Sequence, residues 1–319
     1  MKLVQNTKLF YSNAKLMITG EYLVLKGAKA LSIPLKKGQG LKISEHQGNP
    51  SLVWKTFVKG QHWFDAVFSL NEFVIGNTND FPTAQNLREL LLAAKKIRPG
   101  FLADNIQYEA TSELDFDINW GLGSSSSLMA NIACWAEIDA FDLFSKVSSG
   151  SGYDLATSMS DKPILYHITG NKPSIGKLDF YPVFHEHLYF VYLGRKRNSA
   201  QEVKNFNGLV GERDFTKDIM TIDSITNAMS LTTELQEFRK LMREHEKIIS
   251  GLLDMPPLSD KIMQGFNGEA KSLGAWGGDF ALVATEMNRD YVSSWFRKQD
   301  FQTWFRYEEL ALNPLSPSM

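Results

Sequence analysis

The sequence predicts an α+β fold in two domains, and three observations lead to that prediction. A chain of 319 residues exceeds the usual core of a single domain. Short β-like runs dominate the part before Pro182, whereas helical patterns dominate the part after it. No internal repeat or low-complexity tract interrupts either part. We therefore expect an N-terminal domain at residues 1–182 and a C-terminal domain at residues 183–319.

Several short β-like runs support the strand-rich N-terminal part. The runs at residues 8–11 and 15–19 are separated by the turn-forming pair Ser12-Asn13. The runs at residues 31–35 and 41–44 flank a glycine-containing stretch, which predicts a hairpin. Further strands are expected at residues 51–57, 61–68, 71–75, 105–111, 164–168, 188–193, 280–285 and 301–307.

Helical periodicity is clearest at residues 83–97. Leucines recur there on one helical face, Pro82 precedes the run, and Pro99-Gly100 ends it. Further helices are expected at residues 128–144, 221–253, 259–271 and 289–297.

The composition is that of an ordinary soluble enzyme. The chain has 34 Lys and Arg against 36 Asp and Glu, a formal net charge of −2, which argues against nucleic-acid and membrane-surface partners. Its single cysteine, Cys134, has no intramolecular partner for a disulfide, and no apolar run is long enough for a signal core or a membrane span. We expect a cytoplasmic protein, and the sequence is compatible with a homodimer.

A glycine-serine loop is the most informative stretch of the chain. It consists of Gly121, Leu122, Gly123, Ser124, Ser125, Ser126 and Ser127. The loop enters a predicted helix, whose first N–H groups and dipole favour a phosphate. The glycine spacing fits neither a Walker A loop nor a dinucleotide fingerprint. A serine-rich helix cap after a tight turn gives the same pattern.

Three more segments accompany the loop. Residues 15–22 form a strand that begins with Lys15 and ends in Gly20-Glu21-Tyr22; a lysine there is also common at a sheet edge. Residues 150–154 place Asp154 in a glycine-rich turn, where an aspartate often caps a helix. Residues 271–279 form a second glycine-rich stretch, which by itself resembles a helix cap and turn.

The order of these four segments resembles the motifs of the GHMP kinase superfamily. The middle motif, Gly-Leu-Gly-Ser-Ser, is the most specific, and the resemblance spans Lys15 to Asp279. The variant Gly152-Tyr153-Asp154-Leu155-Ala156 is similar to phosphomevalonate kinases and to a bacterial branch with a Gly-Tyr-Asp-Ile-Ala motif. The resemblance implies a ribosomal-S5-like N-terminal domain and a ferredoxin-like C-terminal domain.

The resemblance also implies roles for residues. ATP phosphates would bind backbone N–H groups of the glycine-serine loop, and Mg²⁺ would bind Ser125 with a carboxylate, for which Asp142 ranks before Asp139 and Glu137. Asp154 would accept the proton of the acceptor hydroxyl, and Lys15 would neutralise charge at the transferred phosphoryl group. The acceptor site would include Glu21, Gly152, Tyr153, Gly274, Gly277 and Gly278.

A basic cluster follows the predicted strand at residues 188–193. Arg195 and Arg197 in this cluster have the chemistry to bind a carboxylate or phosphate on the acceptor. A solvated basic turn is the other interpretation, because charge runs usually face water.

Three functions fit the pattern. The first is an ATP-dependent kinase acting on mevalonate or phosphomevalonate, in isoprenoid precursor synthesis. The second is an ATP-dependent diphosphomevalonate decarboxylase, and the third is a degenerate nucleotide-binding protein. The third is motivated by two bulky departures from the family pattern, Trp120 and Trp276. We expect Trp276 to lie against the nucleotide or the phosphate loop, with packing in the C-terminal core as the alternative.

Overall fold

The chain folds into two compact units that interleave in sequence. The computed structural model describes residues 6–103, 105–170, 172–194, 202, 205–206, 208, 213–261, 263–274 and 279–315. The first unit contains the residues up to Ala14, Lys37–Ile118 and Leu122–Met159. The second contains Lys15–Lys36, Asn119–Gly121 and the residues from Ser160 onward. The domain boundary near Pro182 stays a prediction, and so do the S5-like and ferredoxin-like assignments.

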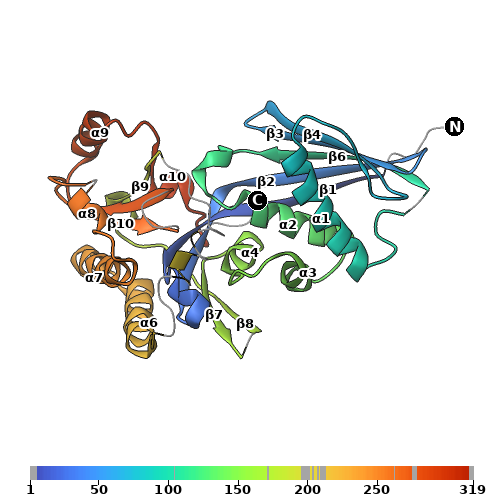
Figure 1. Ribbon diagram of the computed structural model, residues 1–319. Helices are drawn as coiled ribbons and strands as arrows, with labels where there is room; N and C mark the ends of the chain where they lie inside the picture. The colour runs from blue at the N-terminus through green and yellow to red at the C-terminus, as the bar shows by residue number, and fades with distance from the viewer. Residues whose placement is uncertain are drawn as a thin grey trace. The chain divides into compact units, whose positions relative to one another are not determined.

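The first unit is a sheet covered by helices (Figure 1). Its strands run in the order β5, β4, β3, β6 and β2, and β1 also pairs with β2. All these ordered neighbours are antiparallel except β3 and β6, which are parallel. The strands are β1 (Asn6–Thr19), β2 (Ala30–Gln47), β3 (Ser51–Val58), β4 (Gln61–Ser69), β5 (Ile75–Thr78) and β6 (Ile106–Leu114).

Four helices complete this unit. They are α1 (Phe81–Ile97), α2 (Ser124–Ala136), α3 (Ala140–Val147) and α4 (Tyr153–Ser158). Alternate residues of β3 are buried, as expected for a sheet with one covered face. Trp54 of the sheet shares one apolar core with Leu91 of α1 and Ile132 of α2. This core fixes the helices on the sheet and thereby positions the loop that enters α2.

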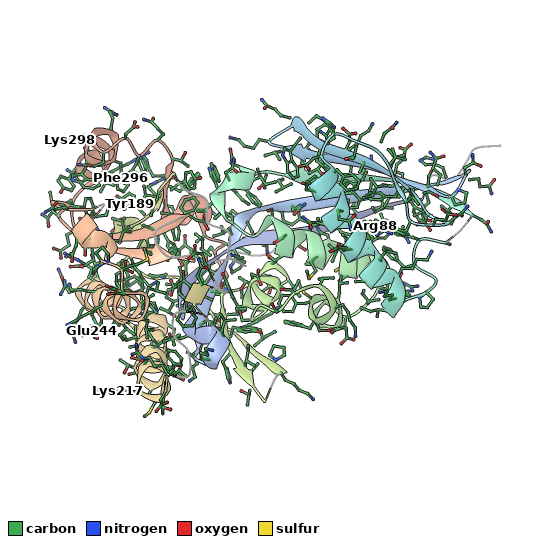
Figure 2. All side chains as sticks on the ribbon, viewed as in Figure 1. Arg88, Tyr189, Lys217, Glu244, Phe296 and Lys298 are labelled. Atoms are coloured by element: carbon green, nitrogen blue, oxygen red, sulfur yellow. The ribbon has the colours of Figure 1, made fainter. Side chains whose placement is uncertain are left out.

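The second unit contains a four-stranded antiparallel sheet in the order β10, β11, β9 and β12. Its strands are β9 (Leu188–Tyr192), β10 (Glu269–Leu273), β11 (Phe280–Ala284) and β12 (Trp304–Arg306). The helices of this unit whose bounds the structure gives are α6 (Thr216–Leu231), α7 (Leu235–Leu253), α8 (Leu258–Lys261), α9 (Arg289–Lys298) and α10 (Tyr307–Leu310). Tyr189 of β9 and Phe296 of α9, labelled in Figure 2, lie in one core of this unit.

Two further strands, β7 (Ile164–Thr169) and β8 (Lys172–Lys177), also belong to the second unit. They pair with each other, and β7 pairs with residues 30–32 of β2. Among the described residues, single-turn 3-10 helices lie at Leu23–Lys26, Ile118–Trp120 and His185–His187.

The predicted hairpin at residues 31–44 is wrong, because β2 continues through it. Gly38 lies within that strand, and a Cβ placed on it would lie 2.4 Å from the carbonyl oxygen of Ser12. Glycine is therefore needed for close packing of β1 against β2, and not for a turn. The turn predicted at Ser12-Asn13 is likewise part of β1.

Three predicted helices have different bounds in the structure. The helix expected at residues 128–144 is divided into α2 and α3 at Glu137, whose φ of 52° ends α2. The helix expected at residues 221–253 is α6 and α7, separated at Thr232–Glu234. The helix expected at residues 259–271 extends only to Lys261, and β10 occupies its far end.

Candidate functional site

The glycine-serine loop leads directly into α2 and leaves the start of that helix without a side-chain cap. Gly123 is the N-cap residue, with a φ of 92° that favours glycine. Helix α2 begins at Ser124, so the serines form its first turn. The first N–H groups of a helix have no acceptor inside it, and no side chain caps them here. This geometry is suited to an anionic ligand.

The four serine hydroxyls of this turn differ in their surroundings. Ser126 and Ser127 are buried, and each donates to a protein oxygen: Ser126 to the carbonyl of Gly123 at 2.9 Å, and Ser127 to Oε1 of Gln39 at 2.7 Å. Ser124 is partly exposed and Ser125 is exposed, and within the described residues neither hydroxyl makes a hydrogen bond. Ser124 and Ser125 therefore have hydroxyls available to a phosphate or a metal ion.

Helix α4 carries Asp154 in the same unit as this turn. Gly152, with a φ of 81°, is the N-cap residue of α4, and Asp154 lies in its first turn. The side chains of Tyr153 and Asp154 are partly exposed. The Ser158 hydroxyl of α4 lies 3.3 Å from the Ser126 hydroxyl of α2. This contact joins the helix that carries Asp154 to the helix that follows the loop.

In the second unit, Gly121 at the start of the glycine-serine loop lies next to Asp279, at the end of the glycine-rich stretch 271–279. Gly121 has a φ of 68°, and a Cβ placed on it would lie 2.1 Å from Oδ2 of Asp279. The positive φ favours glycine, and a side chain at this position would displace the Asp279 carboxylate. The neighbouring Trp120 packs edge-to-face on Phe280 and Phe305, with ring centroids 6.3 and 5.4 Å away. Packing within the second unit thus accounts for the bulk of Trp120.

Glu21 belongs to a buried ionisable cluster in the second unit. Its carboxylate accepts a hydrogen bond from Nζ of Lys271, which lies in β10. His245 of α7 lies 3.2 Å from the other carboxylate oxygen, and its Nε2 accepts from the backbone N–H of Gly20 at 3.1 Å. The next residue, Glu246, accepts from the N–H groups of Leu258 and Ser272, each at 3.1 Å. We name these four side chains, Glu21, His245, Glu246 and Lys271, the ionic cluster.

Burial dominates the protonation of this cluster. Burial raises the pKa of Glu21 above its ordinary value, although the Lys271 ammonium opposes that shift. It raises the pKa of Glu246 to about 7, again against the effect of Lys271. Burial and the nearby Lys271 charge hold the pKa of His245 well below its ordinary value. His245 is therefore neutral, and its contact with Glu21 is not an ion pair.

The predicted site residues are distributed over both units. The first unit holds Ser125, Gly152, Tyr153 and Asp154, whereas the second holds Lys15, Glu21 and Gly274. Lys15 is buried in β1, and its approach to Asp154 stays a prediction. Glu21 is only 3% exposed and is engaged by Lys271, so its environment favours support of the turn after β1 over direct substrate contact.

The carboxylates proposed for Mg²⁺ lie on α3 or next to it. Asp142 is exposed in the first turn of α3, and Asp139 caps that helix by accepting from the N–H groups of Phe141 and Asp142. The described residues contain no group of three or more His, Cys, Asp or Glu side chains that could hold a metal ion. Metal binding by Ser125 and Asp142 stays a prediction. Arg195, Arg197, Trp276, Gly277 and Gly278 lie outside the described residues.

Sequence reasoning missed His245 and Glu246, although α7 carried a signal for both. Its buried face also contains Phe238, Leu241, Met242, Ile249 and Leu252. His245 and Glu246 thus occupy positions that the helical period assigns to the core. A charged or polar residue at such a position indicates a buried partner, which here is the Gly20 N–H for His245 and the Leu258 and Ser272 N–H groups for Glu246.

By sequence, the chain matches no protein-family model and no curated protein. Its structure is similar to L. major mevalonate kinase in complex with R-mevalonate, at 14% identity, 98% coverage of each chain and a TM-score of 0.72. It is also similar to Streptococcus pneumoniae phosphomevalonate kinase in complex with phosphomevalonate and AMPPNP, at 16% identity, 94% and 99% coverage and a TM-score of 0.69. Lactococcus lactis galactokinase complexed with galactose follows at 14% identity, 95% and 90% coverage and a TM-score of 0.64.

The chain has the fold that these mevalonate kinase, phosphomevalonate kinase and galactokinase structures share. The match extends over nearly the whole chain and confirms the α+β class expected from the motifs. Among the described residues, no helix has the length and apolar character needed to cross a bilayer.

Proposed function

We propose that this chain is an ATP-dependent GHMP-type kinase that transfers the γ-phosphate to a small mevalonate-like acceptor. The observation that carries the proposal is the uncapped first turn of α2, with the exposed Ser125 hydroxyl on it and the helix of Asp154 joined to it. Two structures that are similar to this chain over nearly its whole length are a mevalonate kinase and a phosphomevalonate kinase. A galactokinase neighbour keeps other small alcohols within the range of acceptors to test.

The residues of the first turn of α2 fit a nucleotide with its Mg²⁺. Uncapped N–H groups and the helix dipole would hold phosphate oxygens, and the Ser125 hydroxyl would be a metal ligand, with Asp142 as the proposed carboxylate. The bound Mg²⁺ would supply charge neutralisation at the phosphates. Positioning and charge neutralisation are the main requirements of phosphoryl transfer, and this turn would supply the positioning.

Asp154 and Lys15 are the proposed catalytic residues. The partly exposed carboxylate of Asp154 would accept the proton of the acceptor hydroxyl, and the Lys15 ammonium would stabilise charge at the transferred group. Gly152, Tyr153 and Gly274 are proposed to line the acceptor site, with Glu21 supporting it. We propose a cytoplasmic enzyme of isoprenoid precursor synthesis, with no nucleic-acid partner; the homodimer also stays a proposal.

The test combines one variant for binding with one for chemistry. Asp154→Asn should leave ATP affinity nearly unchanged and lower turnover by at least about a hundredfold, because the lost interaction belongs to the transition state. Gly123→Val should abolish nucleotide binding, because a branched side chain would strain the positive φ and cover the amides. Nucleotide affinity is measured by calorimetry with ATP and Mg²⁺. Turnover is measured as ADP release with mevalonate, phosphomevalonate, diphosphomevalonate, homoserine and sugars.

The outcomes of these assays distinguish the three functions. ADP release without CO₂ supports the kinase, whereas CO₂ release with diphosphomevalonate would identify a decarboxylase. Nucleotide binding without turnover on any acceptor would indicate a degenerate binding protein. Full turnover in Asp154→Asn would mean that Asp154 has only a structural role.

A further inference from the structure

A buried network of neutral polar side chains lies beneath the first two turns of α2. It consists of Ser12 of β1, Gln39 of β2, Ser112 of β6, and Ser127 and Asn131 of α2. All five residues are at most 5% exposed, and all belong to the first unit. We name this set the amide network.

Gln39 is the centre of the amide network and holds α2 at two points. Its side-chain Oε1 accepts from the Ser127 hydroxyl at 2.7 Å, and its Nε2 donates to the Ser112 hydroxyl at 2.7 Å. Its backbone carbonyl accepts from Nδ2 of Asn131 at 2.8 Å. Since Ser127 and Asn131 are four residues apart, one strand residue binds two successive turns of the same helix face.

The network extends from the sheet to the glycine-serine loop itself. The Ser127 hydroxyl that binds Gln39 also lies 3.0 Å from the carbonyl oxygen of Gly123, the N-cap residue of α2. The Ser127 N–H donates to the same carbonyl at 3.0 Å. At the second turn, Asn131 accepts from the Ser12 hydroxyl at 2.9 Å. The helix start is thus connected to three strands through directional contacts.

Apolar packing alone would not fix the helix in this way. The residues that follow on the same strand, Leu41 and Ile43, lie in the apolar core that α2 covers, so an apolar residue at position 39 would satisfy the burial pattern. Apolar contacts are not directional, and they permit a small slide or rotation of the helix. Hydrogen bonds at two turns fix both the height and the rotation of α2.

We propose that Gln39 is a positioning residue for nucleotide binding. It holds the first turn of α2 at one height on the sheet, so that the N–H groups of Ser124–Ser126 are directed toward the phosphates. Gln39 itself is only 2% exposed, so it would act through Ser127 and not by direct contact with a nucleotide. This inference rests on the proposed function, because it assigns the network a task in that site.

The experiment compares Gln39→Met with a matched control, Thr56→Val. Methionine has a similar length and removes the amide. Thr56 of β3 is 4% exposed and accepts from Nε1 of Trp54 at 2.9 Å, so its replacement also breaks a buried hydrogen bond in the same unit. Both variants should lower the thermal midpoint by similar amounts. Affinity for ATP–Mg²⁺ by calorimetry should fall about tenfold in Gln39→Met and change less than about twofold in Thr56→Val.

Two further variants keep the test decisive. Gln39→Glu should restore most of the affinity at low pH, because a protonated glutamic acid can both donate and accept in place of the amide. If Gln39→Met does not fold, Ser127→Ala removes the same helix contact with the loss of one oxygen. Affinity within about twofold of the unaltered protein in Gln39→Met, or in Ser127→Ala where Gln39→Met does not fold, would overturn the inference.

Hydrogen exchange separates this inference from the proposed function. The amide network predicts faster exchange in Gln39→Met at the Ser127 amide, which donates to the Gly123 carbonyl, and unchanged exchange there in Thr56→Val. If the unaltered protein binds no ATP but this difference appears, the proposed nucleotide site is wrong and the positioning of the turn stands. If ATP binds and the difference is missing, the positioning is wrong and the nucleotide site stands.

Discussion

The two units hold their glycine-rich segments in place with different kinds of polar interaction. In the first unit, the amide network around Gln39 is built from neutral groups. In the second unit, the ionic cluster places Glu21 and Lys271 out of water beside Glu246 and His245. Neutral hydrogen bonds contribute modestly and equally at every pH, whereas buried charges depend strongly on their partners and on protonation. The second unit should therefore be the more vulnerable to loss of one side chain.

The largest expected effect is the loss of Lys271. Lys271→Met leaves the Glu21 carboxylate buried without its cation, which should lower the free energy of unfolding by about 3–5 kcal/mol. Gln39→Met in the first unit should cost about 1–3 kcal/mol, because only neutral groups lose partners. Urea unfolding of both variants at neutral pH measures the difference.

A double variant is the control for charge. Glu21→Gln combined with Lys271→Met removes both charges and should recover part of the loss, since no buried charge then lacks a partner. Equal losses in Lys271→Met and Gln39→Met would contradict the contrast between the units.

The next effect is the pH dependence that Glu246 gives the second unit. Its pKa of about 7 in the folded protein lies above the ordinary value of 4.5. Between these two pH values, the folded state keeps the proton of Glu246 while the unfolded state releases it. The stabilising protonated form is present below the ordinary pKa, and its advantage is lost as the pH rises through about 7. That loss amounts to roughly 3 kcal/mol.

Glu246→Gln isolates this contribution, because all other groups titrate in both proteins. The unfolding free energy of the unaltered protein minus that of the variant should fall by roughly 2–3 kcal/mol between about pH 5 and pH 8. His245 has the opposite sign, since its lowered pKa makes the fold less stable as the pH falls below about 6.5. A difference that does not change with pH would show that Glu246 does not titrate in this interval.

The smallest expected effect tests whether the pH dependence of the second unit comes from its ionic cluster or from the unit as a whole. Thr226 of α6 donates to the Thr19 hydroxyl at 2.8 Å, and both residues are fully buried in the second unit. Thr226→Val should cost about 1 kcal/mol, the usual net value of a neutral hydrogen bond. The cost should be the same at about pH 5 and pH 8 in chemical denaturation. If this cost depended strongly on pH, the pH response of the second unit would not come from the ionic cluster alone.

Local sequence signals identified the elements with strong periodicity. The helix expected at residues 83–97 corresponds to α1, and Pro82, which served as its start signal, lies in the first turn of that helix. The helix at residues 289–297 corresponds to α9, and the strand at residues 164–168 corresponds to β7. Such signals depend on neighbours along the chain, so they are present in the sequence itself.

Contacts between distant segments were not readable in the same way. Gly38 and Gln39 have the composition of a turn, yet one permits strand packing and the other binds α2. Glu137 ends α2 in a left-handed conformation without a glycine or proline to announce it. For the candidate site, the order of motifs pointed to Ser125 and Asp154, whose roles stay predictions, but it did not point to His245, whose partners lie more than 200 residues away. Tertiary packing decides these positions, and one sequence does not display it.

The ionic cluster also has a consequence for how the protein is made. The hydrogen bond between Lys271 and Glu21 joins residues 250 positions apart, and the residues of the first unit end at Met159. During synthesis, the first unit therefore has its whole sequence outside the ribosome while the second still lacks β10 and α7. Throughout that interval Glu21 has no cation to pair with and remains hydrated. The segment that begins with Lys15 is thus among the first to be translated and among the last to reach its final environment.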